Sequence, residues 1–209
     1  MKVWREHEDH LLQGEWHIHT SYTDGEGSIF AYCHRAVDLG IPLLAFTEHV
    51  RRSPNYDFHA FLNDIDAAQE DFDLIILSGC EAKILPGGGL DADEAILGEV
   101  DYPVFSFHSF PNDMELRFSS LEAALKNRYV NAWAHPVTSS RGQGMDLPEE
   151  RLKEIFDLMR TRDVLFELNE KYGDPAEAWT TLARERGVSF VRGSDVHFMQ
   201  DLRKGCGKK

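Results

Sequence analysis

The chain has 209 residues, of which 42% are hydrophobic and 28% are charged, a composition typical of a folded globular protein. Its formal net charge of -14 argues against a surface built to hold nucleic-acid phosphates. No apolar run approaches the roughly 18 residues of a membrane span, the first ten residues are polar, and three cysteines do not form a disulfide framework. We therefore expect a single cytoplasmic domain over residues 1–209, without a membrane partner.

Strand-like and helix-like patterns alternate along the chain. Side chains on a strand point to opposite faces in turn, so His17 and His19 of the first strand share one face. Ser28 and Gly40 are typical of the residues that begin and end a helix, and Ser119 caps another. In chain order we expect strands near 15–19, 41–47, 74–81, 103–108, 129–136, 164–169 and 188–192, and helices near 29–39, 58–71, 119–127, 148–160 and 175–185.

This alternation predicts a parallel sheet with helices outside, because parallel strands need crossover connections. The Gly-rich segment 83–91 is interpreted as a short hairpin, since it does not open a helix with the spacing of a phosphate-binding loop. Polar side chains follow the C-terminal ends of successive strands: His17, His19, His49, Glu81, His108, His135, Asp195 and His197. Only a ring of strands brings these ends to one point, so we expect a barrel with its site there.

Imidazoles and carboxylates at that end form a candidate metal site. The candidate ligands are His17, His19, Asp24, His49, Glu81, His108, His135, Asp195 and His197. Nine ligands are too many for one ion and suit two or three divalent ions, with Glu81 as a bridge. Ligation without thiolate favours Zn, Mn or Fe. Metals about 3.5–4 Å apart produce a hydroxide at neutral pH and bind phosphoryl oxygens, so the expected nucleophile is metal-bound hydroxide.

Six motifs in order resemble those of the PHP superfamily (polymerase and histidinol phosphatase). They are His17-Ile18-His19-Thr20 with Asp24-Gly25, Thr47-Glu48-His49, Gly79-Cys80-Glu81, Ser106-Phe107-His108-Ser109, Ala134-His135-Pro136 and Gly193-Ser194-Asp195-Val196-His197. The continuation 81–87 resembles the branch that includes stand-alone bacterial phosphatases and the C-terminal domain of family X DNA polymerases. The resemblance implies an α/β fold, a distorted seven-stranded TIM-like β/α barrel forming one PHP metallohydrolase domain over 1–209.

The resemblance also implies how the ligands divide among the metals. One metal would take His17, His19, Glu81 and Asp195, a second Glu81, His108 and His135, and a third Asp24, His49 and His197. Glu48 stands where the family commonly has Asp, and we expect it to support a ligand without binding metal itself. Asp24 stands where some relatives have His. Glu81, Asp195 and Glu48 are the candidate catalytic carboxylates.

The predicted function is a metal-dependent phosphoesterase acting on a small phosphate monoester, either histidinol phosphate or a nucleotide-type substrate. Arg51, Lys83 and Arg141 follow strand ends and are the candidate phosphate-binding residues. An alternative is a DNA or RNA 3′-end-processing phosphatase or exonuclease, which requires a basic groove and aromatic stacking positions. A non-catalytic metal-binding or assembly module is the third possibility, and a missing ligand would favour it. The sequence retains the full set.

Overall fold

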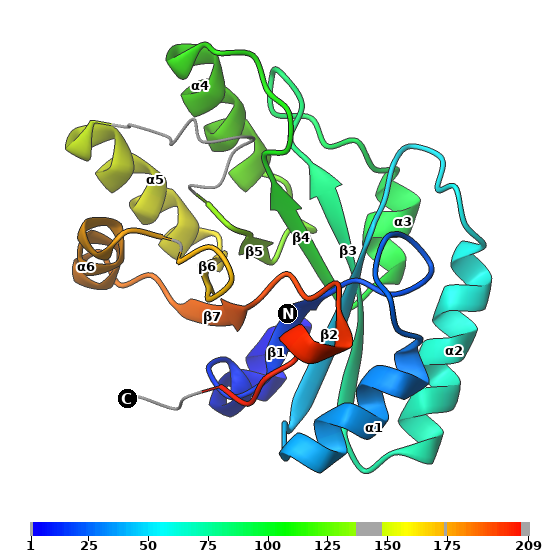
Figure 1. Ribbon diagram of the computed structural model, residues 1–209. Helices are drawn as coiled ribbons and strands as arrows, with labels where there is room; N and C mark the ends of the chain where they lie inside the picture. The colour runs from blue at the N-terminus through cyan, green and yellow to red at the C-terminus, as the bar shows by residue number, and fades with distance from the viewer. Residues whose placement is uncertain (1, 137–147, 174, 206–209) are drawn as a thin grey trace.

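The computed structural model describes residues 2–136, 148–173 and 175–205 (Figure 1). At its centre is a parallel sheet of seven strands, each paired with the next in sequence. The strands are β1 (Glu15–Ile18), β2 (Leu43–His49), β3 (Ile75–Lys83), β4 (Tyr102–Ser106), β5 (Ala132–Trp133), β6 (Leu165–Asn169) and β7 (Phe190–Gly193). All seven C-terminal ends therefore lie at the same edge of the sheet.

Residues just beyond β7 close the sheet against β1. The amide of Val196 donates to the carbonyl of His17 at 2.9 Å, and the amide of His19 donates to the carbonyl of Val196 at 2.8 Å. Arg192 of β7 and Glu15 of β1 form a buried ion pair across the same seam, with Nη1 and Oε2 2.8 Å apart. The fold is thus a nearly closed, seven-stranded TIM-like β/α barrel, as predicted.

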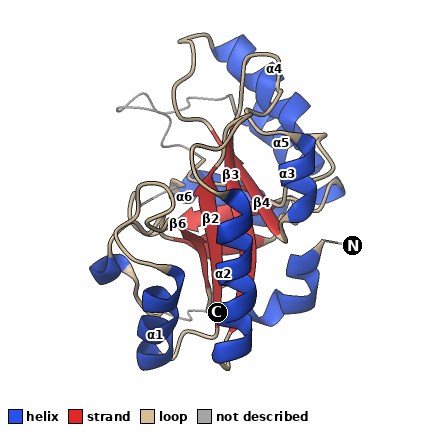
Figure 2. Ribbon diagram, turned by 90° about the vertical axis from the view of Figure 1, so that its right-hand side faces the viewer, coloured by secondary structure: helices blue, strands red, loops and turns tan. Residues whose placement is uncertain are grey.

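Six α-helices among the described residues lie outside the strands, as Figures 1 and 2 show. They are α1 (Ile29–Leu39), α2 (Phe58–Asp71), α3 (Glu94–Glu99), α4 (Met114–Leu125), α5 (Glu149–Thr161) and α6 (Glu177–Glu185). Ser28 caps α1 by accepting from the amide of Ala31, and Gly40 ends it in the left-handed conformation, both as predicted. In this part of the chain no helix is long and apolar enough to cross a bilayer.

A separate apolar cluster fills the barrel below the strand ends. Trp16 and Tyr102 belong to it, with ring centroids 4.9 Å apart, and Trp4 joins it from an N-terminal 3-10 helix, Val3–His10. The register of β1 shifts by one residue against β2, because Glu15 pairs with Leu44 while Ile18 pairs with Phe46. This bulge lets Trp16 pack in the apolar interior while the next residue, His17, turns to the polar end.

The predicted start of the fourth α-helix at Ser119 is wrong. The helix begins at Met114, because the side chain of Asp113 accepts from the amide of Leu116 and caps it there. The hydroxyl of Ser119 instead donates to the carbonyl of Leu116 inside the helix. Two residues with capping side chains precede or lie in this helical segment, and the helix begins at the earlier one, Asp113, six residues before Ser119.

One additional helix and one shortened strand also differ from the sequence expectation. The helix Glu94–Glu99 was not predicted, since six residues are too few to give a clear apolar periodicity. The strand expected at 129–136 contains only Ala132–Trp133, and soon after it the φ of 27° at His135 takes the chain out of the extended conformation. The hairpin at 83–91 is confirmed by an antiparallel bridge between Ile84 and Leu90.

Candidate metal centre

All nine predicted ligands lie together at the C-terminal end of the barrel. They form four overlapping groups in which the ligand atoms lie within 4.8 Å of one another. The groups are His17, His19 and Asp195; His17, Glu81 and His135; His49, Glu81 and His108; and His19, Asp24, His49 and His197. Asp195 and His197, which follow β7, complete two of the groups with residues in and after β1, so these two groups depend on closure of the barrel.

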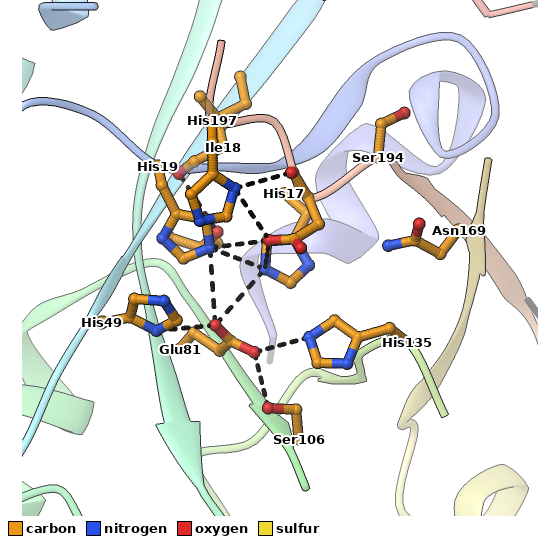
Figure 3. Close-up of polar contacts among 12 residues, drawn as sticks. His17, Ile18, His19, His49, Glu81, Ser106, His135, Asn169, Ser194 and His197 are labelled. Carbon is orange, nitrogen blue, oxygen red and sulfur yellow. Dashed lines mark hydrogen bonds and ion pairs between the residues drawn. The ribbon is translucent and has the colours of Figure 1, made fainter. Parts of the chain in front are cut away.

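The carboxylate of Glu81, on β3, belongs to two of these groups and lies close to histidines of the other two. Its Oε2 lies 2.9 Å from His49 Nδ1, 3.5 Å from His19 Nε2 and 3.7 Å from His17 Nε2. Figure 3 shows His49 and His135 pointing at this carboxylate from opposite sides. Its side chain is fully buried, so one carboxylate faces several imidazoles with almost no solvent between them.

The second oxygen of Glu81 faces a different pair of imidazoles. Glu81 Oε1 lies 2.9 Å from His135 Nε2 and 3.5 Å from His108 Nε2, and it accepts a 2.6 Å hydrogen bond from the Ser106 hydroxyl. Burial alone would raise the pKa of Glu81, but the histidines around it hold that pKa well below its usual range. Glu81 is thus an ionised carboxylate with a separate set of nitrogen neighbours for each oxygen.

His17 and His19 face each other and Asp195. Their Nε2 atoms are 3.2 Å apart, and these atoms lie 3.6 Å and 3.2 Å from Oδ1 of Asp195. Burial lowers the pKa of His19 to about 4, so its imidazole is neutral at pH 7 and one ring nitrogen carries a lone pair. Converging imidazole and carboxylate lone pairs are the donor set that a divalent cation requires.

Two of the predicted ligands have a strained backbone. His135 has a φ of 27° and Asp195 a φ of 47°, in the left-handed region that favours glycine. A non-glycine residue held in this region costs about 1–3 kcal/mol and tends to occur at functional sites. The backbone is therefore strained at the two positions whose side chains point toward the candidate ligand groups.

Asp24 joins the outer group from the loop that follows β1. Its Oδ2 lies 3.5 Å from His49 Nε2 and its Oδ1 lies 3.4 Å from His197 Nε2. The Asp24 side chain is 55% exposed, whereas the ligands nearer the barrel axis are buried. This outer group is thus the most accessible of the four.

Glu48 belongs to none of the four groups, and it holds the loop that carries Asp24. Its Oε1 accepts a 2.8 Å hydrogen bond from the amide of Thr20, and its Oε2 accepts from the hydroxyl of Thr23. Burial raises the pKa of Glu48 to about 7. The carboxylate therefore supports a candidate ligand through the backbone.

Glu167 is a site residue that sequence reasoning missed. From β6 its Oε2 lies 2.7 Å from His17 Nδ1, and its Oε1 accepts from the amide of His135 at 2.9 Å. The side-chain amide of Asn169 donates to the same Oε1 at 2.9 Å. Glu167 thus orients two candidate ligands. The sequence signal that could have indicated this role is the pair Glu167 and Asn169, two residues apart in an otherwise apolar strand.

Lys171 and Tyr172, also missed, reach the site from the loop after β6. The Tyr172 hydroxyl donates to Oδ2 of Asp195 at 2.6 Å, and Lys171 Nζ donates to the Asp195 carbonyl at 2.9 Å. Burial and the carboxylate of Asp195 raise the pKa of Tyr172, so its phenol stays protonated at pH 7. These two side chains fix the conformation of Asp195 from outside the ligand groups.

Two cavities open onto the ligand groups, and His49 and His108 line both. The first measures about 400 Å³ and is lined also by Lys171, Tyr172 and Phe198. The second measures about 250 Å³ and includes two of the predicted phosphate-binding residues, Arg51 and Lys83. Lys83 donates from Nζ to the Ser109 hydroxyl at 2.7 Å, and Arg51 is exposed. Arg141, the third, lies outside the described residues.

A parallel β/α barrel that gathers imidazoles and carboxylates at the C-terminal ends of its strands defines a metal-binding barrel protein. The sequence model of the PHP domain matches residues 15–133, more than half of the chain. The chain therefore belongs to the PHP family, as its motifs predicted.

Two relatives show how this chain compares with longer proteins. It is 29% identical over 207 residues to the DNA polymerase/3'-5' exonuclease PolX of Bacillus subtilis, covering 93% of this chain and 36% of PolX. It is 28% identical over 164 residues to a protein of Acetivibrio thermocellus named "Probable phosphatase", covering 76% of this chain and 68% of that protein. The chain thus spans about a third of the length of PolX.

Two solved structures share the fold. A candidate histidinol phosphatase from Listeria monocytogenes superposes with a TM-score of 0.73 at 18% identity, covering 93% of this chain and 98% of that one. The histidinol phosphate phosphatase of Lactococcus lactis, in complex with Zn, L-histidinol and phosphate, gives a TM-score of 0.68 at 15% identity, covering 90% and 87%. At these identities the likeness concerns the fold.

Proposed function

We propose that this chain is a metal-dependent phosphatase that hydrolyses a small phosphate monoester, histidinol phosphate or a nucleotide-type substrate. Membership of the PHP family and the relatives named as phosphatases support a hydrolase of this class. The observation that carries the proposal is the buried carboxylate of Glu81, which faces the imidazoles of five histidines with its two oxygens. A buried carboxylate with this surrounding is suited to bridge two cations.

The donor set fits two or three divalent ions, for which we propose Zn, Mn or Fe. The proposed ligand sets are His17, His19, Glu81 and Asp195; Glu81, His108 and His135; and Asp24, His49 and His197. His49 lies nearer to Glu81 than to Asp24, at 2.9 Å against 3.5 Å, so it stands between the second and third sets. Bound ions of this kind would polarise a phosphoryl oxygen and acidify a water molecule.

The remaining side chains orient the ligands and bind the phosphate. Glu167 accepts from Nδ1 of His17, which leaves Nε2 free to face the centre. Tyr172 donates to Oδ2 of Asp195 and leaves Oδ1 directed at the imidazoles. Lys171 lines the larger cavity beside Asp195, so we add its ammonium group to Arg51 and Lys83 as a proposed phosphate-binding cation.

Processing of a DNA or RNA 3′ end is the second candidate function. The observation that favours it is the alignment with PolX, which covers 93% of this chain. The net charge of -14 opposes it, because phosphate-backbone binding depends on clustered lysine and arginine. We therefore rank the small monoester first.

The test is release of inorganic phosphate by protein loaded with Mn or Zn. The substrates are histidinol phosphate, nucleoside monophosphates, nucleoside bisphosphates and a 3′-phosphorylated oligonucleotide, with Asp195→Ala as the blank. Turnover of a small monoester that disappears in the variant supports the phosphatase. Release from the oligonucleotide alone favours end processing. Metal-loaded protein that is inactive on the whole panel contradicts both and favours a non-catalytic module.

A further inference from the structure

Two exposed aromatic rings stand beside the metal centre. The exposed large hydrophobic side chains of the described residues are Leu12, Val37, Met114, Tyr172 and Phe198. Tyr172 and Phe198, 43% and 49% exposed, both line the cavity of about 400 Å³ that also holds Asp195 and His197. Single exposed apolar residues are common on protein surfaces. Two exposed rings that line one cavity of a size typical of ligand pockets provide a surface that a ligand can cover.

Both rings are carried by backbone that is held in place. Tyr172 donates its hydroxyl to Asp195 at 2.6 Å and its amide to Oδ1 of Asn169 at 3.2 Å. The backbone of Phe198 is fixed on both sides, since the carbonyl of His197 accepts from Glu26 at 2.7 Å and its own carbonyl accepts from Asp201 at 2.9 Å. A ring on a fixed backbone loses less freedom when a ligand binds than a ring on a mobile loop, which favours affinity.

Both rings lie next to residues that we propose to hold the metal ions and the phosphate. Tyr172 contacts Asp195 directly, and Phe198 is the next residue after His197. Lys171 Nζ lies 3.6 Å from Oδ2 of Asp195 and 5.3 Å from the centroid of the Tyr172 ring. A phosphate held by Lys171 at the metal centre would therefore place the group esterified to it against the rings.

The other cavity offers different chemistry. Its lining includes Asp24, Arg51, Lys83 and Asp91, so charged groups dominate it. An apolar or aromatic leaving group would have to give up water there without gaining contact with a ring. The larger cavity is the one that suits such a group.

We propose that Tyr172 and Phe198 form a stacking subsite that selects phosphate monoesters whose alcohol carries a planar aromatic ring. The inference rests on the proposed phosphatase function and specifies the substrate class of the same site. Stacked or edge-to-face ring pairs stabilise a complex beyond the area they bury, and the contact persists from substrate binding to the transition state. The subsite is therefore expected to lower KM more than it raises kcat.

The test compares benzyl phosphate with cyclohexylmethyl phosphate, two monoesters of similar size and leaving-group acidity that differ in the aromatic ring. The wild-type kcat/KM is expected to favour benzyl phosphate by about 3–10-fold, mainly through KM. In Phe198→Leu, which keeps an apolar side chain and leaves Tyr172 as the one ring of the subsite, this ratio is expected to fall at least about twofold. Phe198→Tyr restores a ring and should restore the ratio. Val37→Ala, at an exposed apolar position of α1, is the control and should keep it.

Binding of the non-hydrolysable phosphonates separates this inference from the proposed function. Calorimetry with benzylphosphonate and cyclohexylmethylphosphonate measures the ring preference whether or not either ester is hydrolysed. Protein that hydrolyses neither ester but binds benzylphosphonate more tightly, with the preference reduced in Phe198→Leu, supports the subsite while the phosphatase fails. Equal affinity for the two phosphonates, or a ring preference that is undiminished in Phe198→Leu, overturns the subsite.

Discussion

Nδ1 of His17 lies 2.7 Å from Oε2 of Glu167, and both groups are buried. The contact joins the first strand of the barrel to the sixth and points Nε2 of His17 at Glu81 and Asp195. A histidine that ligates through one ring nitrogen commonly has the other nitrogen fixed by such a carboxylate, which sets its tautomer and its basicity. The first candidate ligand in the chain is thus oriented by a residue 150 positions later.

Glu167→Gln is expected to weaken metal binding by about 10–100-fold, because the amide loses the charge that holds His17. The affinity is measured by competition with a chromophoric chelator. Glu154→Gln, at an exposed position of α5, is the control and should leave the affinity unchanged. Wild-type affinity in Glu167→Gln would show that this contact does not act on the metal.

Glu81→Gln and His197→Ala are expected to differ in how many ions they remove. Glu81 belongs to two of the four ligand groups, whereas His197 belongs only to the outer one. We expect His197→Ala to lose at most one metal equivalent per chain and Glu81→Gln to lose more. Metal content is measured by mass spectrometry of the native protein. The same loss in both variants would contradict the bridging position of Glu81.

Glu48→Gln is expected to stabilise the metal-free protein at neutral pH. Burial raises the pKa of Glu48 from 4.5 to about 7, so between these values the folded state holds a proton that the unfolded chain has released. Stability contributed by this group is therefore lost as the pH rises from about 4.5 to about 7, by on the order of 3 kcal/mol. Glutamine keeps an acceptor for the Thr20 amide and removes this dependence.

The measurement is urea unfolding of chelator-treated protein at pH 5 and pH 8. The loss of unfolding free energy between the two pH values should be smaller in Glu48→Gln than in wild type. Parallel pH profiles for the two proteins would mean that Glu48 already titrates normally in the folded state.

Arg192→Ala is expected to destabilise the fold by about 3–5 kcal/mol, because it leaves the buried carboxylate of Glu15 without its ion-pair partner. Replacing both residues, as Glu15→Gln with Arg192→Met, should recover a large part of this loss. Chemical unfolding of the single and double variants measures the effect. A double variant as unstable as Arg192→Ala alone would argue that another Arg192 contact matters more than the ion pair.

The barrel and the candidate ligands could be predicted because both leave local marks in the sequence. His49, His108 and His135 each follow a short apolar run, and the order of strands in a β/α barrel carries such residues to one end. The structure places each of the nine predicted residues in at least one group whose ligand atoms lie within 4.8 Å of one another, and the division among ions remains a prediction. The ligands could be predicted because the same pattern, a histidine or carboxylate after an apolar run, recurs at the end of one strand after another.

The missed residues leave no comparable mark. Glu167 sits in an apolar strand run, and its two-residue spacing from Asn169 indicates a shared face of the strand but does not indicate that the carboxylate turns toward His17. Tyr172 and Lys171 act on Asp195 across more than twenty residues, a contact created only by the neighbouring loops after β6 and β7. Arg51 and Lys83 could be placed near the strand ends, but the cavity they line depends on side-chain packing.

Val196 lies between Asp195 and His197 and also forms both backbone hydrogen bonds that close the barrel onto β1. Opening the seam would carry two candidate ligands away from His17 and His19, so local unfolding and release of ions are coupled. Metal ions should therefore slow amide hydrogen exchange at Val196 and His19 far more than at the outer helices. Bound ions would therefore strengthen the junction between β7 and β1, which an isolated bridge between Ile18 and Val196 closes in place of a strand ladder.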